Sequence, residues 1–123
     1  PTARVLADDH YVLLPDHDPR AVLAAFAERE ISHVLLEGGP TLATGFLRAG
    51  LVDQVVAYTA PALLGAGAAA LADFGAATIT DALRLSHPRV EVLGAGDELA
   101  VRLCGDLEAD DVPTAHTHTE ESH

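Results

Sequence analysis

The sequence predicts an α/β fold, a mixed sheet with a parallel core and an antiparallel hairpin at its C-terminal end. Short apolar runs alternate with helical patterns over the first sixty residues, which is typical of strand–helix–strand units. Two alternating segments, Arg89–Leu93 and Glu98–Leu103, flank Gly94-Ala95-Gly96-Asp97 and indicate the hairpin. A length of 123 residues allows one domain with a core of reasonable size.

The N-terminal part is predicted to form a strand, a helix and a second strand. Tyr11–Leu14 has the pattern of a short strand, and His33–Leu36 that of a strand buried on both faces. Between them, a helix should begin with Asp18 as N-cap and Pro19 in the first position, and run to about Glu30. This unit should be parallel and right-handed. The helix should bury three apolar side chains: Val22, Leu23 and Phe26.

The next junction joins that second strand to a helix through two glycines. Glu37 stands where the strand should end, Gly38 and Gly39 follow, and Pro40 suits the first helical position. The helix should continue to the residue before Gly50, its C-terminal stop. Free N–H groups and a partial positive charge at a helix start favour phosphate binding, although neither GxGxxG nor a Walker A loop is present. A plain strand-to-helix turn is the alternative. The apolar face of this helix should hold Leu42, Phe46 and Leu47.

The rest of the chain should complete the sheet. Asp53–Ala60 is rich in β-forming residues and predicts a strand. Pro61–Ala77, rich in alanine and glycine, is interpreted as a loop with a short helix, and Thr78–Leu85 as the connection to the hairpin. Residues 104–123 are polar and acidic without periodicity, which predicts a disordered tail.

Three motifs carry a resemblance to a known family. They are EGGPTL at Glu37–Leu42, LRAGLVD at Leu47–Asp53 and APALLG at Ala60–Gly65. In this order they resemble the C-terminal part of the reductase domain of the bacterial bifunctional deaminase-reductase of riboflavin biosynthesis, a dihydrofolate reductase-like domain. The similarity extends to about Leu103. It implies that residues 1–103 are the C-terminal portion of such a domain, with its N-terminal part missing.

The resemblance also implies an activity and a site. The activity is NADPH-dependent reduction of 5-amino-6-(5-phosphoribosylamino)uracil to its ribitylamino form, by a homodimer. Glu37 would contact this phosphorylated pyrimidine substrate. Two other interpretations stay open: a reductase of the same fold acting on another pteridine-like or carbonyl substrate, and a non-catalytic fragment retaining half of the site. The NADPH-binding residues would be Gly38, Gly39, Pro40, Thr41, Leu42, Ala43, Thr44 and Gly45.

Composition excludes several other classes of function. The net charge is −12 and all seven basic residues are arginine, so no basic surface for nucleic acid or an anionic membrane is expected. Cys104 is the single cysteine, which precludes an intrachain disulfide and fits a reducing cytoplasm. No apolar run has membrane-spanning length. The sequence contains no methionine, which predicts a processed or truncated piece.

Acidic and histidine residues cluster in three places without predicting a metal site. Asp8-Asp9-His10 and Asp16-His17-Asp18 are explained by turn and cap roles. In the predicted tail no framework would hold ligands in fixed geometry, so solvated side chains are expected there. The tail cluster comprises His116, His118, Glu120, Glu121 and His123.

Overall fold

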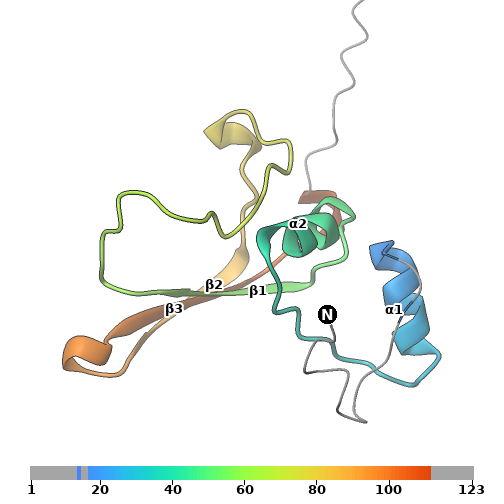
Figure 1. Cartoon of the computed structure of the whole chain (residues 1–123), viewed down its shortest axis with the longest axis horizontal. Coiled ribbons are helices and arrows are strands. Elements are labelled where there is room, and N and C mark those ends of the chain that lie inside the picture. Colours follow the sequence, from blue (N-terminus) through green and yellow to red (C-terminus); the bar gives the residue numbers. More distant parts are fainter. Residues whose placement is uncertain (1–13, 15–16, 112–123) are drawn as a thin grey trace, which may run out of the picture. The chain divides into compact units, whose positions relative to one another are not determined.

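The computed structural model of the chain describes residue 14 and residues 17–111. They fall into two compact units, one ending at Leu35 and the other beginning at Leu36. The first unit contains one α-helix, and the second contains another together with a three-stranded sheet (Figure 1). Most of the predicted strand Tyr11–Leu14 and residues 112–123 of the predicted tail lie outside the described residues. The elements are α1 (Pro19–Ala27), α2 (Pro40–Arg48), β1 (Gln54–Thr59), β2 (Ser86–Leu93) and β3 (Ala100–Asp106).

Helix α1 confirms the predicted start and corrects the predicted end. The Asp18 carboxylate accepts a hydrogen bond from the Arg20 backbone N–H at 3.3 Å, and Pro19 is the first helical residue. The helix ends at Ala27 rather than near Glu30, which has a positive φ of 59° and so cannot continue the helix. Its apolar side chains are half-buried instead of buried: Val22, Leu23 and Phe26.

The segment His33–Leu36, predicted as a buried strand, has no regular structure. Val34 is 46% exposed and Leu35 is 81% exposed. A strand needs a neighbour to pair its backbone N–H and C=O groups, and no described strand pairs with this segment. The predicted parallel core is therefore not seen in residues 17–111, where both ladders are antiparallel. The described residues therefore form a small α/β fold.

Helix α2 matches its prediction closely. Gly50 has a φ of 67°, and its N–H donates to the Leu47 carbonyl at 3.0 Å. The Leu51 N–H donates to the Phe46 carbonyl at 3.1 Å, which completes a Schellman motif and satisfies the last carbonyls of the helix. Phe46 and Leu47 are buried, whereas Leu42, predicted on the same face, is 48% exposed. The C-terminal half of α2 is thus the part that packs.

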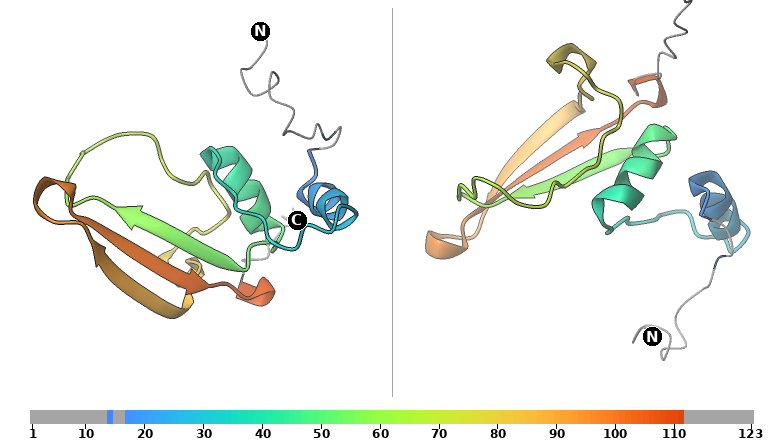
Figure 2. Two further views of the ribbon diagram at one scale, coloured as in Figure 1. Left: turned by 90° about the horizontal axis from the view of Figure 1, so that it is seen from below. Right: turned by 45° about the horizontal axis from the view of Figure 1, so that its top comes forward.

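The sheet has the strand order β1-β3-β2, with β3 in the centre (Figure 2). The β1–β3 ladder runs from Gln54 opposite Asp106 to Thr59 opposite Val101. On the other side, β2 and β3 form the predicted hairpin, with an irregular register near the start of β2. As the central strand, β3 has the most buried residues of the three.

The sheet extends past the predicted start of the tail. Strand β3 continues through Cys104 and Gly105, both buried, to Asp106. Leu107 is also buried, and its N–H donates to the Asp53 carbonyl at 2.9 Å. The boundary predicted at residue 104 is therefore too early, because these residues are part of the folded unit. Cys104 is a free buried thiol inside a strand.

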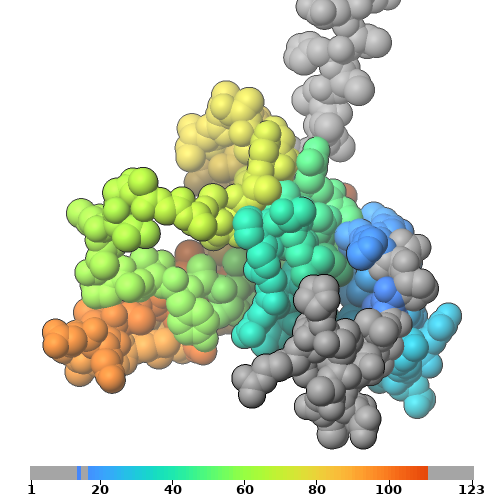
Figure 3. Space-filling view, in the orientation of Figure 1, coloured from blue at the N-terminus to red at the C-terminus, as the bar shows by residue number. Residues whose placement is uncertain are grey.

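The predicted short helix within Pro61–Ala77 is wrong. This segment is irregular throughout, and Leu63 and Leu64 are 104% and 83% exposed. The first regular turn follows it, a 3-10 helix at Ile79–Asp81 closed by a Thr78–Asp81 capping box. Figure 3 shows the first part of the loop standing away from β1. None of the helices in the described part of the chain is long and apolar enough to cross a membrane.

The hairpin turn offers a matched test of backbone strain and packing. Gly94 and Gly96 both have positive φ, 71° and 60°. A Cβ on Gly94 would lie 2.5 Å from the Glu98 carbonyl oxygen, whereas one on Gly96 would meet nothing within 4 Å. Gly96→Ala should therefore lower the free energy of unfolding by about 1–2 kcal/mol, because a residue with a Cβ is strained at this positive φ. Gly94→Ala should lower it by about 2–5 kcal/mol, since overpacking adds to the strain.

Urea unfolding followed by circular dichroism measures both variants. Equal losses in the two would contradict this account, because the hairpin would then have relaxed around the new methyl group at position 94.

Candidate functional site

The predicted site residues form the approach to α2 and its first turns. Glu37, Gly38 and Gly39 are exposed and lead into the helix at Pro40. Gly39 is the N-cap residue, with φ −66° and ψ 170°. This is an extended conformation, as is usual for the residue before the first turn of a helix. The glutamate and the glycines therefore lie at the N-terminus of α2, as the sequence predicts, although no strand precedes them.

The start of α2 lacks a side-chain cap. Gly39 has no side chain to accept from the first-turn N–H groups, and Pro40 has no N–H. The N–H groups of Thr41 and Leu42 therefore have no cap of the kind that Asp18 gives to α1. The first turn also carries no acidic residue. Such a helix start favours an anion, through its N–H groups and the helix dipole.

The two glycines differ in what surrounds them. A Cβ added to Gly39 would meet no heavy atom within 4 Å, whereas one added to Gly38 would lie 2.8 Å from Leu42 Cδ2. Gly39 also has an ordinary negative φ, so its own conformation does not require glycine. The backbone at Gly39 is thus open to a group arriving from outside the chain. At Gly38 glycine is explained by the neighbouring leucine.

The second half of the predicted cofactor set lies deeper. Thr44 is only 4% exposed, and its hydroxyl accepts the Ala72 N–H at 2.8 Å. This contact ties α2 to the loop that follows β1. Ala43 and Gly45 are half-buried, whereas Pro40, Thr41 and Leu42 are exposed. The surface that a ligand can reach is therefore formed by Glu37 and the five residues after it.

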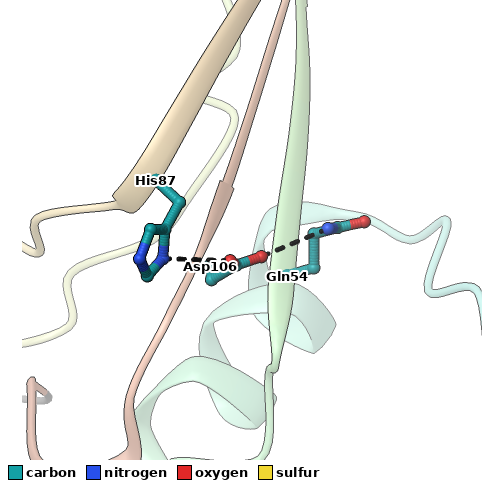
Figure 4. A network of polar contacts seen from close by, with 3 residues as sticks. All are labelled: Gln54, His87 and Asp106. Atoms are coloured by element: carbon teal, nitrogen blue, oxygen red, sulfur yellow. Dashed lines mark hydrogen bonds and ion pairs between the residues drawn. The ribbon is translucent and has the colours of Figure 1, made fainter.

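A polar network closes one end of the sheet (Figure 4). The Asp106 carboxylate accepts from Gln54 Nε2 at 3.3 Å and lies 3.4 Å from His87 Nδ1. The three residues come from β3, β1 and β2, so the contacts join all three strands. His87 has a positive φ of 50° at the irregular start of the β2 ladder. This network was not predicted from the sequence, because its members are up to 52 positions apart.

A second polar group crosses the middle of the sheet. Arg102 of β3 forms an ion pair with Glu91 of β2. A hydrogen bond with the Tyr58 side chain, and secondly the charge of Glu91, raise the pKa of Arg102 above its usual value. Arg102 therefore stays positively charged at every pH at which the protein would be assayed. In the part of the chain that the structure describes, no group of three or more metal-ligating side chains occurs.

Most of the chain is similar in sequence to known proteins. The sequence model of the RibD C-terminal domain family matches residues 2–96. The chain is 47% identical over 95 residues to the riboflavin biosynthesis protein RibD of Mycobacterium tuberculosis, covering 76% of this chain and 27% of that protein. It is 34% identical over 83 residues to RibD of Aquifex aeolicus (68% and 23%) and 32% identical over 99 residues to RibD of Escherichia coli (76% and 26%). The chain thus spans about a quarter of these relatives' length. No solved structure matches it.

Proposed function

Because this chain belongs to the family of RibD C-terminal domains, we propose that it serves riboflavin biosynthesis as part of an NADPH-dependent reductase. The proposed reaction reduces 5-amino-6-(5-phosphoribosylamino)uracil to the ribitylamino form. The observation that carries the proposal is the EGGPTL motif, which lies inside the matched span and forms an exposed, uncapped helix start. We also propose that β1, β2 and β3 are the antiparallel end of a dihydrofolate reductase-like sheet with a parallel core.

The residues at the start of α2 suit the binding of a dinucleotide phosphate. When bound, NADPH supplies the hydride, and the protein supplies position and electrostatics. The N–H groups of Thr41 and Leu42 would donate to a phosphate oxygen, and the open backbone at Gly39 would allow close contact. Pro40 and Gly38 would line the same surface. Thr44 would act indirectly by holding the following loop against α2.

Glu37 suits a substrate-orienting role. It is exposed, and within the described residues its carboxylate makes no hydrogen bond. A free carboxylate is an acceptor for N–H groups, which a pyrimidine ring and its amino substituents present. Its place beside the proposed phosphate site would hold the substrate next to the cofactor. The scaffold does not use this side chain, so its removal should affect the reaction more than the fold.

Glu37→Gln should lower kcat/KM by about tenfold to a hundredfold, because a charge-assisted hydrogen bond is replaced by a neutral one. The assay uses a chimaera in which this chain replaces the matching 95-residue span of Mycobacterium tuberculosis RibD. Glu98→Gln, an equal change at the exposed hairpin turn, is the control and should leave kcat/KM unchanged. NADPH affinity and melting temperature should be the same in all three proteins. A collapse of thermal stability in Glu37→Gln alone would assign Glu37 to the scaffold.

A further inference from the structure

The irregular loop that follows β1 carries a motif that takes no part in the proposed site. The motif is APALLG, Ala60–Gly65, one of the three that resemble the reductase family. Its two leucines, Leu63 and Leu64, are 104% and 83% exposed. A Cβ on Gly67 would lie 2.8 Å from Leu64 Cδ2, so Leu64 lies over the backbone of its own loop. Both leucines therefore have apolar surface left to bury.

The loop is fixed at both ends and free between them. At one end, Thr59 pairs with Val101 in the β1–β3 ladder. At the other end, the Ala72 N–H donates to the Thr44 hydroxyl at 2.8 Å, and this hydroxyl donates to the Ala72 carbonyl at 3.5 Å. Within the part of the chain that the structure describes, residues 60–71 make one backbone hydrogen bond, and both its partners belong to this stretch. Figures 1 and 2 show the stretch bowing away from the sheet between its two ends, so it has slack.

The fixed end at Ala72 lies close to the proposed phosphate site. Thr44 follows Thr41 by three residues, so the two side chains fall on the same face of α2, about 4.5 Å apart along its axis. Helix side chains lean toward the N-terminus, which places the Thr44 hydroxyl over the first turn. The loop is thus held within one helical turn of the N–H groups proposed to bind phosphate. Leu64 precedes Ala72 by eight residues, about 26 Å of extended chain, which is enough to reach the start of α2.

We propose that this loop is a lid that closes over the ligand at the start of α2. Leu63 and Leu64 are its covering residues, and Thr44 is the positioning residue that holds its fixed end. The lid rests on the proposed reductase function. A nicotinamide ring and a pyrimidine ring have flat faces against which leucine side chains can bury their exposed surface. A closed lid also excludes water from hydride transfer and strengthens the electrostatic contact of Glu37 with the substrate. The ligand-free chain is the open form.

Hydrogen exchange of the chimaera with Mycobacterium tuberculosis RibD, with and without NADPH, tests the lid. Bound NADPH should slow exchange of the amides of residues 62–71 at least about tenfold, together with those of Thr41 and Leu42. Protection of Thr41 and Leu42 alone would overturn the lid and leave the cofactor site standing, whereas protection at neither place would overturn both. Protection of the loop before NADPH is added would show that another part of RibD covers the leucines, which also overturns the lid.

A double variant, Leu63→Ser with Leu64→Ser, removes the covering side chains. In the chimaera its dissociation constant for NADPH, measured by fluorescence titration, should rise at least about tenfold, because the area that two leucines bury on closure is lost. Its melting temperature should not change, since both side chains are exposed without the ligand. Ile79→Ser is the control, because it removes an apolar side chain that is 77% exposed and lies beyond the fixed end. It should leave the constant unchanged, and equal weakening in the two variants would contradict the lid.

Thr44→Val tests the fixed end in residues 1–123 without any ligand. Valine keeps the shape of threonine but cannot accept the Ala72 N–H, so the Ala72 amide should exchange at least about tenfold faster. Thr80→Val, the same change at an exposed position of the 3-10 helix, should leave that rate unchanged. In the chimaera, Thr44→Val should abolish the NADPH-dependent protection of the loop, whereas Thr44→Ser, which keeps the hydroxyl, should retain it. Loop protection that survives in Thr44→Val would overturn the positioning role of Thr44.

Discussion

Residues 1–123 alone should show no NADPH-dependent turnover, whereas the chimaera with Mycobacterium tuberculosis RibD should reduce the ribosylamino side chain of the pyrimidine substrate. The chain matches 27% of that relative's length, and Glu37 and the first turn of α2 are exposed. A site formed by this surface alone leaves most of a substrate in water. Positioning of reactants accounts for large parts of enzymatic rates, so we expect a difference on the order of a thousandfold or more.

The measurement is the steady-state loss of NADPH absorbance with the ribosylamino substrate. The matching 95-residue span cut from Mycobacterium tuberculosis RibD is the control, and it should be as inactive as the chain. Turnover by the isolated chain at a rate close to that of the chimaera would show that the other three quarters of RibD are dispensable for this reaction. An inactive chimaera would contradict the reductase proposal itself.

Gly39→Val should weaken NADPH binding to the chimaera by well over tenfold. A Cβ added at Gly39 would meet no heavy atom within 4 Å, so we expect the variant to fold with little change in stability. The bulk would instead stand where a phosphate has to approach the N–H groups of α2. Loss of affinity without loss of stability is therefore the expected combination. Fluorescence titration with NADPH and thermal unfolding measure the two quantities.

Gly38→Ala provides the contrast. Its Cβ would press on Leu42 Cδ2, the end of a flexible side chain that can rotate away. We expect a change in NADPH affinity of about threefold or less, because the leucine and not the ligand gives way. If Gly39→Val folds and its dissociation constant for NADPH is unchanged, the two glycines serve only the backbone turn. The assignment of the cofactor surface is then wrong.

Helix α2 and the β2–β3 hairpin were predicted correctly, because the residues that set their limits lie within or next to them in the sequence. The start and end of α2 follow from Pro40 and Gly50, and the hairpin follows from the glycines between its strands. The segment His33–Leu36 was mispredicted because a strand exists only with a partner, which its own residues do not encode. The burial of Thr44 was missed for a similar reason. Its partner Ala72 is 28 positions away in an irregular loop.

The sheet also sets the order in which the chain can fold. Leu93 faces Ala100 across a short turn, so the β2–β3 ladder closes a small loop and can nucleate early. The β1–β3 ladder pairs Gln54 with Asp106, 52 positions away, and must close a loop that contains the whole irregular segment and the hairpin. We therefore expect docking of β1 to be the slower step. Until it occurs, both sides of the hairpin remain open to pairing with other chains.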